Sequence, residues 1–364
     1  MGWWWLRNTV LEVSRKAFLN NYKTVLDYVG KDVLVMPVIK ANCYGTYLNK
    51  DNILMNNFSI VAVSLVDEAL QLRRDGYKND IFVLNQPYIN EIETIIDNDI
   101  IIGVSSSDFL EEIVSLNRNI RIHIEVETGM GRTGVSLNDL ECFLNKLSNT
   151  NIIVEGVYTH FASADIDHEF TIRQINLFND AVLIVKKYFP NIKYIHCSAS
   201  NGILNYDLGA CNMVRPGLIL YGYPASKSMI SKINLEPVAK FKSKISFIKN
   251  IKAGDSISYG RSFVASGDMK VATVGCGYAD GVKRSLSNKG FVSVKGKRCM
   301  IVGKICMDSF MIDVSNLSDV AVGDDVYLFD NSVVTLDEVA LICETINYEI
   351  LATIGERVPR IFVD

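Results

Sequence analysis

The lysine at position 40 ends an apolar run and precedes a turn of small residues, in the segment 33–45, VLVMPVIKANCYG. This pattern predicts a buried strand that delivers a basic side chain at its carboxyl end, where α/β barrels keep their chemistry. Burial beside an apolar core lowers the pKa of a lysine amine, and the neutral amine can attack an aldehyde to form a Schiff base. A lysine just past a strand is more commonly an ordinary surface residue, so the catalytic interpretation depends on the rest of the chain.

Three further strand ends carry polar residues. His160 lies in YTHFA, Ser200 opens a predicted helix in IHCSASNG, and Arg215 and Gly217 lie in VRPGL. Free N–H groups at a helix start bind phosphate, and a glycine lets the backbone approach it closely. Taken singly, these residues favour ordinary roles: a core hydrogen-bonding histidine, a turn and a surface ion pair.

Their order along the chain resembles the motifs of the alanine racemase family, whose members use pyridoxal 5′-phosphate (PLP). The resemblance runs from about residue 10 to residue 363 and includes at least seven collinear segments. The nine segments that resemble the family are MPVIKANCYG, EVETGMGR, YTHFA, IHCSASNG, VRPGL, ISYGRSF, GYADG, KICMD and IGERVPR. One such motif would be weak evidence, but this many in the same order identify the chain as a member of the family.

The resemblance implies that Lys40 is a catalytic residue and holds PLP. It places His160 beside the cofactor ring and Ser200 at the phosphate. The other cofactor-binding positions that it implies are Tyr44, Arg215, Gly217 and Leu218.

Arg215 carries a chemical expectation of its own. PLP aminotransferases keep the pyridine nitrogen protonated with a carboxylate, which makes the ring a strong electron sink. An arginine cannot accept that proton, so the nitrogen stays neutral and the substrate carbanion is less delocalised. Transamination is then disfavoured, and removal and return of one proton remain as the main reaction.

The segment 125–132, EVETGMGR, resembles the motif whose arginine holds a cofactor hydroxyl and the substrate, a role that falls on Arg132. Many family members have a lysine, sometimes carbamylated, where this chain has Glu125. A glutamate supplies the same negative charge to orient Arg132 without modification.

The remaining motifs lie late in the chain. By resemblance, Tyr259 is the second catalytic base, and Tyr278 and the backbone of Met307 line the side of the substrate carboxylate. Tyrosine titrates near pH 10, so a neighbouring imidazole and guanidinium would help it act at neutral pH. In the family these residues complete the site of the other subunit, which implies a homodimer with shared active sites.

Glu356 is a clear departure, because most members have a tyrosine there that touches the phosphate and narrows the pocket. A smaller or more polar group would admit a hydroxymethyl side chain, so serine is an alternative substrate to alanine. The carboxylate is also unfavourable beside a phosphate unless it is paired or turned away.

The elements that must position these residues follow an alternating pattern. Eight short apolar runs are expected as strands, at 33–36, 59–63, 80–84, 99–103, 121–126, 151–158, 193–196 and 213–215. Amphipathic stretches between most of them are expected as helices, at 65–74, 91–97, 107–116, 137–147 and 170–187, after a first helix within 12–30. This alternation predicts a (β/α)8 barrel of the TIM type.

The pattern changes between residues 220 and 237. Alternating runs at 241–251, 270–274, 290–303, 310–314 and 325–329, with one helix at 335–346, predict a mainly antiparallel β-domain. We therefore expect an α/β chain with a PLP-binding barrel at 8–233 and a C-terminal β-domain at 234–364. The N-terminal strand around 7–13 is expected to join the two.

The composition restricts the partners. The 364 residues carry a net charge of −4 without a basic stripe, which disfavours nucleic acid as a partner. The eight cysteines form no CxxC or Cys/His pattern, so no metal site is expected. We expect them to be reduced thiols of a cytosolic protein. No apolar run is long enough for a bilayer and no signal peptide is visible. The tryptophans at positions 3–5 fit the end of a membrane anchor, a packed strand or an artificial extension equally well.

The predicted function is racemisation of alanine in the cytoplasm by a two-base mechanism that uses Lys40 and Tyr259. The product would supply D-alanine for cell-wall precursors. A PLP-dependent decarboxylase is an alternative, but such enzymes are usually longer and have a carboxylate at the ring nitrogen. A non-catalytic PLP-binding barrel is another, but those proteins lack the β-domain.

Overall fold

The computed structural model describes residues 7–51, 55–223 and 232–364, and the tryptophans at positions 3–5 lie outside them. The chain divides into two compact units. The barrel unit consists of Ala17–Cys43 and Leu48–Glu236, and the β unit of Met1–Lys16, Tyr44–Tyr47 and Pro237–Asp364.

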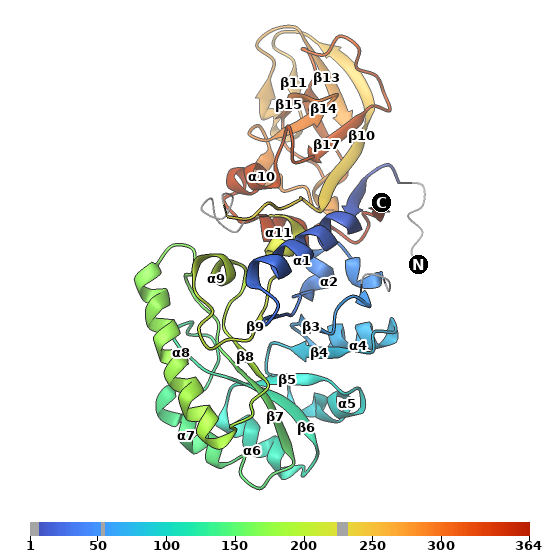
Figure 1. Ribbon diagram of the computed structural model, residues 1–364. Helices are drawn as coiled ribbons and strands as arrows, with labels where there is room; N and C mark the ends of the chain where they lie inside the picture. Colours follow the sequence, from blue (N-terminus) through green and yellow to red (C-terminus); the bar gives the residue numbers. More distant parts are fainter. Residues whose placement is uncertain (1–6, 52–54, 224–231) are drawn as a thin grey trace. The chain divides into compact units, whose positions relative to one another are not determined.

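Parallel strands form the centre of the barrel unit (Figure 1). They are β2 (Leu34–Val35), β3 (Ile60–Val63), β4 (Asp80–Val83), β5 (Ile101–Val104), β6 (Ile120–Glu125), β7 (Ile152–Tyr158), β8 (Tyr194–His196) and β9 (Met213–Val214). Strands β3 to β8 form one six-stranded sheet in sequence order, and β2 pairs with β9. Parallel bridges from Val38 to Ala62 and from Ala199 to Arg215 join the two sheets, so the strands close into a barrel.

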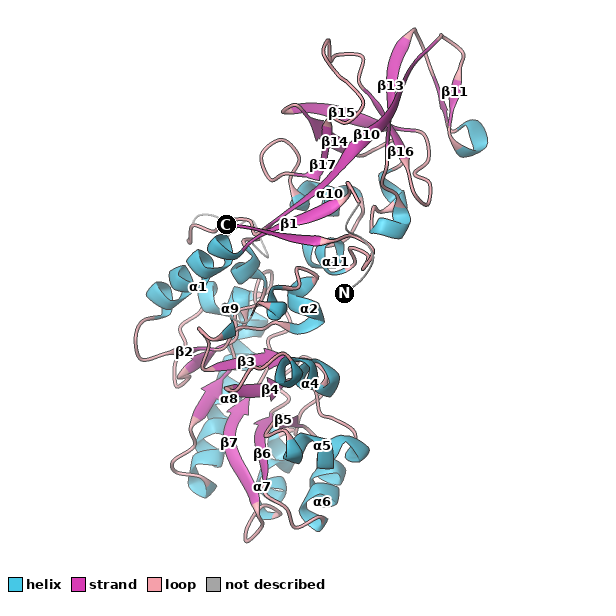
Figure 2. Cartoon of the chain, turned by 90° about the vertical axis from the view of Figure 1, so that its right-hand side faces the viewer, coloured by secondary structure: helices cyan, strands magenta, loops and turns pink. Residues whose placement is uncertain are grey.

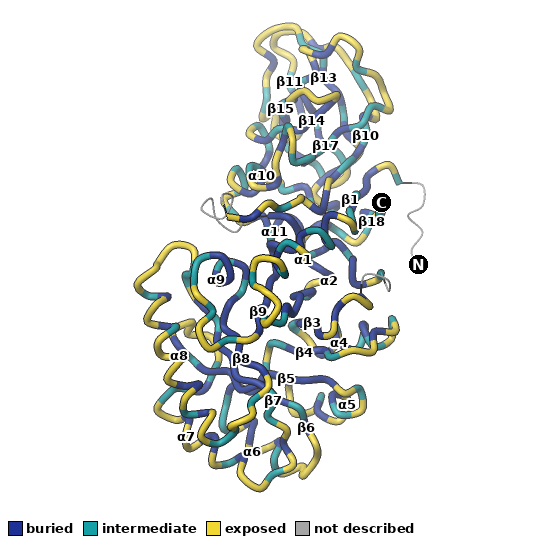
Figure 3. The backbone as a smooth tube through the Cα atoms, in the orientation of Figure 1, coloured by how far each residue is buried: buried dark blue, intermediate teal, exposed yellow. Residues whose placement is uncertain are grey.

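The strands form because their isoleucine- and valine-rich runs bury both faces, as parallel strands in a barrel require. Every residue of β3 and β5 is buried. The surrounding helices are α1 (Arg15–Val29), α4 (Val66–Arg74), α5 (Ile92–Asp97), α6 (Ser107–Ser115), α7 (Leu137–Asn145), α8 (His168–Tyr188) and α9 (Ser200–Asn205). Ser106, Ser136 and Asp167 cap α6, α7 and α8 by accepting a hydrogen bond from a backbone N–H in the first turn. Figure 3 shows the buried strands inside and the exposed outer faces of these helices.

The β unit contains a mainly antiparallel sheet (Figure 2). Its strands are β1 (Val10–Ser14), β10 (Ala239–Ile251), β13 (Met269–Val274), β14 (Phe291–Val294), β15 (Lys297–Val302), β16 (Phe310–Asp313), β17 (Asp325–Phe329) and β18 (Arg360–Val363). The first half of β10 pairs with β1 and β17 and its second half with β13, so the sheet closes on itself. A separate pair, β11 (Ser256–Ile257) and β12 (Phe263–Val264), flanks the short helix η5 (Tyr259–Arg261).

The predicted barrel with a C-terminal β-domain is confirmed. Some details differ from expectation. Residues 290–303 form the hairpin of β14 and β15 rather than one strand. Two helices, α10 (Leu336–Ile342) and α11 (Asn347–Ala352), follow residue 335 where one was expected. The second was missed because it begins just beyond the apolar pattern used to delimit the first.

The eight cysteines are free thiols. Among the described helices, none has the length and apolar character needed to cross a membrane.

Candidate active site

Lys40 follows an extended segment held between two neighbouring strands. The Met36 and Val38 N–H groups donate to the carbonyls of Val214 and Pro216, both at 2.9 Å, and the Ile39 N–H donates to Ala62 at 2.8 Å. The lysine therefore leaves the carboxyl end of the β2 segment, as the sequence predicts.

Directly after Lys40 the backbone turns with left-handed geometry. The φ angles from Ala41 to Tyr44 lie between 50° and 54°, and Lys40–Tyr44 forms the short helix α2. Each non-glycine residue in this region costs about 1–2 kcal/mol. A run of four is therefore strained and requires contacts that hold it, as strained backbone at functional sites commonly does.

Partial burial is the main cause that lowers the pKa of the Lys40 amine, and the charge of Arg132 lowers it further. Glu68 acts in the opposite direction. The net effect is a lowered pKa, which is the direction that the sequence pattern predicts for a nucleophilic amine.

Arg215 lies in the barrel interior with 2% of its surface exposed, not on the surface as an isolated arginine would. Its Nη1 donates to the His196 carbonyl at 3.0 Å and its Nη2 to the carbonyls of Thr159 and Cys197 at 2.7 and 3.1 Å. The two nitrogens also lie 2.7 Å from Nδ1 of His196 and 3.3 Å from Nδ1 of His160. No carboxylate among the described residues forms an ion pair with Arg215, so its positive charge is held by neutral acceptors.

His160 is neutral in this environment. Burial, followed by the charges of Arg215, Arg132 and Lys40, lowers its pKa to about 3. All four residues follow the carboxyl ends of barrel strands, where the sequence predicts the site, and His160 senses the charges of the other three. An arginine always donates, so Nδ1 of His160 accepts and its proton is on Nε2.

Glu125 is buried at the end of β6. Burial raises its pKa, while hydrogen bonds with Thr133 and Tyr158 and the charge of Arg132 lower it. No hydrogen bond or ion pair joins Glu125 to Arg132 in the described part of the chain, and Arg132 is exposed. The expected orientation of Arg132 by Glu125 is therefore a longer-range charge effect in this structure.

Ser200 and Gly217 lie together, as their motifs predict. Ser200 is the first residue of α9, and its Oγ accepts from the N–H groups of Gly217 and Ile219 at 3.2 and 3.5 Å. The hydroxyl proton of Ser200 remains able to donate to an anion. Leu218, between the two donors, is buried and begins the short helix η3 (Leu218–Tyr221).

Tyr259 lies in the β unit, 69% exposed, between β11 and β12. Ile257 and Ala265 anchor this hairpin in an apolar cluster. Ser258 and Arg261 have positive φ angles of 66° and 51°, so the turn that presents Tyr259 is strained.

Tyr278 and Met307 are also brought together within the β unit. The Tyr278 N–H donates to Cys306 and the Ala279 N–H donates to Met307, both at 3.0 Å. Gly277 permits this approach, because a Cβ there would lie 2.3 Å from the Met307 carbonyl oxygen.

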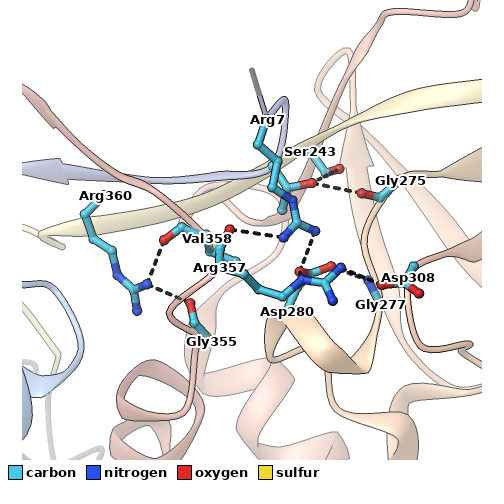
Figure 4. Close-up of polar contacts among 11 residues, drawn as sticks. Arg7, Ser243, Gly275, Gly277, Asp280, Asp308, Gly355, Arg357, Val358 and Arg360 are labelled. Atoms are coloured by element: carbon cyan, nitrogen blue, oxygen red, sulfur yellow. Dashed lines mark hydrogen bonds and ion pairs between the residues drawn. The ribbon is translucent and has the colours of Figure 1, made fainter. Parts of the chain in front are cut away.

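Asp280 anchors the same turn (Figure 4). It is fully buried and accepts from the Gly277 N–H at 2.9 Å. Its Oδ1 forms ion pairs with Arg7 at 2.5 Å and with Arg357 at 2.9 Å, and Arg357 also reaches Asp308 at 2.5 Å. Sequence reasoning included Asp280 in a motif but gave it no role; a carboxylate two residues after Tyr278 was the available signal.

Two other residues of interest belong to the β unit. Tyr44 packs edge-on against Tyr348, with ring centroids 6.1 Å apart. Glu356 is hydrogen-bonded to the Tyr47 side chain and feels the charge of Arg360, whose guanidinium lies 4.7 Å from the Tyr47 ring centroid. The Glu356 carboxylate is thus paired with Tyr47 and near Arg360. Such pairing is one of the two arrangements that make a carboxylate acceptable beside a phosphate.

Two further residues received no role from the sequence: Glu68, which accepts from the Ala41 N–H directly after Lys40, and His123, whose Nδ1 lies 2.9 Å from Nε2 of His196. Glu68 was hidden in an amphipathic helix, and His123 in the strand of the EVETGMGR motif. Neither has a sequence pattern that distinguishes it from a surface glutamate or a core histidine.

Comparison with known proteins gives a uniform result. The model of the alanine racemase N-terminal domain matches residues 13–225, and that of the alanine racemase C-terminal domain matches residues 238–362. Alanine racemase 2 of Caldanaerobacter subterraneus is 34% identical over 98% of this chain and 95% of its own length. The alanine racemase of Halothermothrix orenii is 36% identical over 97% and 96%. A crystal structure of alanine racemase from Bacillus anthracis with bound L-Ala-P has a TM-score of 0.91 and 34% identity, covering 99% of this chain and 96% of that chain.

Proposed function

The chain belongs to the alanine racemase family, and on that premise we propose that it interconverts L- and D-alanine with Lys40 and Tyr259 as its two bases. Its activity is that of an isomerase of this type, and its substrate is a small amino acid. The observation that carries the proposed roles is the half-buried Lys40 at the end of the β2 segment, which His160 and Arg132 sense electrostatically and whose amine pKa is lowered, with Arg215 bonded to His160.

The donors at this end of the barrel fit PLP, on which the family depends. Arg215 is a buried cation that forms no ion pair with a carboxylate of the described residues, which suits a neutral pyridine nitrogen. Lys40 would hold the aldehyde carbon, and His160 would lie beside the ring. Ser200, with the backbone of Gly217 and Leu218, offers hydrogen-bond donors for a phosphate, and Tyr44 is a further proposed contact.

When bound, PLP supplies an electron sink that makes the substrate Cα–H more acidic. Lys40 then removes or returns the proton on one face of Cα, and Tyr259 of the partner subunit does so on the other. Two bases on opposite faces are what inversion requires. His160 stays neutral beside the charge of Arg215. The Cα proton therefore moves to and from the two bases and not to the histidine.

Substrate binding is assigned to Arg132, Tyr278 and the backbone of Met307. Arg132 would hold the carboxylate, because its fork of donors matches that group. The comparisons do not favour the serine alternative, because the matched relatives are named alanine racemases.

The protein is proposed to act as a homodimer. Tyr259 and Met307 are 69% and 53% exposed in the single chain, as residues that complete a partner's site would be. Mixing Lys40→Ala and Tyr259→Phe protomers tests this directly. Random hybrids should regain about a quarter of wild-type activity, because half the dimers then hold one intact site of two. No recovery after verified subunit exchange would contradict the shared site.

Two other proposals concern the cellular compartment and the domain boundaries. The eight free thiols fit a reducing compartment, which supports the cytoplasm. The domain division at 8–233 and 234–364, with a joining strand around 7–13, stays a prediction.

The activity is tested with the purified full-length chain, PLP, and L-alanine or L-serine, each product read by chiral chromatography. We expect rapid conversion of alanine and much slower conversion of serine. Lys40→Ala should abolish both activity and the visible absorbance of lysine-bound PLP. Unchanged turnover in that variant would refute the assignment, as would release of carbon dioxide in place of D-alanine.

A further inference from the structure

Glu68 occupies the third position of helix α4 and caps its start. Its Oε2 accepts hydrogen bonds from the backbone N–H groups of Ser64 and Leu65, at 2.8 and 3.1 Å. These contacts occupy one carboxylate oxygen and fix the side chain relative to the carboxyl end of β3.

The other oxygen reaches the segment that carries Lys40. The Ala41 N–H donates to Oε1 of Glu68 at 2.5 Å. Ala41 is the first residue of the left-handed turn from Ala41 to Tyr44, whose backbone is strained. One carboxylate therefore joins the start of α4 to the residue directly after the catalytic lysine.

We propose that Glu68 is a positioning residue for Lys40, because it clamps the strained turn against the start of helix α4. The inference deepens the proposed function and rests on it. The Cys43 N–H also donates to Ile39, at 3.0 Å, but that bond lies within the segment itself. The contact with Glu68 ties the segment to another element of the barrel.

A carboxylate is the group that this clamp needs. Its two oxygens face backbone donors from two different segments, and an amide offers only one oxygen. Glutamine can cap α4 or hold Ala41, but in doing both it would set its NH2 against a backbone N–H. Glu68→Gln therefore separates the cap from the clamp, whereas Glu68→Ala removes both.

The charge of Glu68 gives an independent readout. It raises the pKa of the Lys40 amine, against partial burial and the charge of Arg132, which lower it. His160, which also senses the charge of Lys40, has a pKa of about 3 and is neutral. Removing the Glu68 charge should move the pH profile for PLP capture by the lysine to lower pH.

Asp67 provides the matched control. It is an exposed acidic residue in the first turn of the same helix. Asp67→Asn removes the same charge from the helix start but makes no change at the turn.

The experiment compares full-length wild type, Glu68→Gln, Glu68→Ala and Asp67→Asn. Hydrogen exchange of peptides covering residues 41–44 is followed, with kcat for alanine and the pH profile of PLP capture. In Glu68→Gln we expect at least about tenfold faster exchange at the turn. We also expect at least about tenfold lower kcat and a capture profile at lower pH, with near-wild-type thermal stability. Asp67→Asn should match wild type throughout.

Wild-type exchange and kcat in Glu68→Gln would overturn the proposal. Equal changes in Glu68→Gln and Asp67→Asn would also overturn it, because they would show a general effect of helix charge. If the wild type does not racemise alanine, the proposed function fails, while the exchange comparison still tests the clamp separately.

Discussion

Arg215 donates through Nη1 to Nδ1 of His196 at 2.7 Å, and both side chains are buried. Because the arginine always donates, the imidazole accepts at Nδ1 and its proton is on Nε2. That nitrogen lies 2.9 Å from Nδ1 of His123, which must accept in turn. The Nε2 of His123 then carries a proton and is buried without a hydrogen-bond partner among the described residues. The charge of Arg215 thus sets the tautomers of two histidines in the barrel core.

These histidines make stability depend on pH. Burial, followed by nearby arginines, lowers the pKa of His123 and His160 to about 3, and that of His196 well below 6.5. In the unfolded chain they titrate near 6.5, so below that pH the unfolded state binds protons that the native state does not. The contribution of these histidines to the free energy of unfolding is therefore complete above about pH 6.5 and is lost as the pH falls below it. Each histidine contributes up to about 1.4 kcal/mol per pH unit.

Urea unfolding between pH 7.5 and 5.5 measures this slope above the range of most carboxylates. His123→Phe should reduce the slope, because it removes one of these buried imidazoles. A flat profile in the wild type would contradict the neutral core histidines.

Arg215→Lys should lower kcat for alanine by at least about tenfold and stability by about 2 kcal/mol or more. A lysine cannot reach the carbonyls of Thr159, His196 and Cys197 together, because one ammonium replaces a planar fork of donors. Arg173→Lys is the control, since Arg173 is exposed and contacts only the ring of Phe170 in the described structure. Steady-state kinetics and urea unfolding check both effects, and near-wild-type kcat in Arg215→Lys would count against the role of this network.

Asp280→Asn should destabilise the β unit by about 3 kcal/mol. This is the low end for a buried pair, because Arg7 and Arg357 are partly exposed. The Gly277 contact can survive, so the loss reports on the ion pairs. Asp308→Asn, at a mostly exposed partner of Arg357, should cost less than about 1 kcal/mol. Urea unfolding compares the two variants, and equal losses would show that burial of Asp280 is not decisive.

A raised KM for alanine should accompany Asp280→Asn because the same turn carries Tyr278.

Tyr259→Phe should reduce racemisation at least about a hundredfold in both directions, because either direction needs both bases. Proton abstraction from one enantiomer should fall much more than from the other, since Lys40 still serves one face. Exchange of the Cα proton in D2O, measured separately for L- and D-alanine, checks this asymmetry. Equal exchange rates for both enantiomers, unchanged from wild type, would rule out Tyr259 as a base.

The sequence by itself determined the barrel, the β-domain and the placement of Lys40, His160, Ser200 and Arg215 at strand ends. Those features depend on local patterns: apolar runs of strand length, amphipathic helices and polar residues directly after them. Eight repeats of strand and helix favour a closed barrel, with the helices covering the outside of the parallel strands. The order of the motifs identified the family, and the full-length comparisons confirm that identification.

The tertiary structure alone decided how those residues are supported. Glu68 meets Ala41 across 27 positions of the chain, His196 meets His123 across 73, and Asp280 joins Arg7 to Arg357. No period or spacing in the sequence predicts such pairs, because each depends on strand register and side-chain direction in the folded barrel or sheet. The same is true of the left-handed turn after Lys40, since Ala41 to Tyr44 include no glycine to announce it. Local patterns fix which elements form, whereas long-range hydrogen bonds and buried charges decide where the chemical groups finally lie.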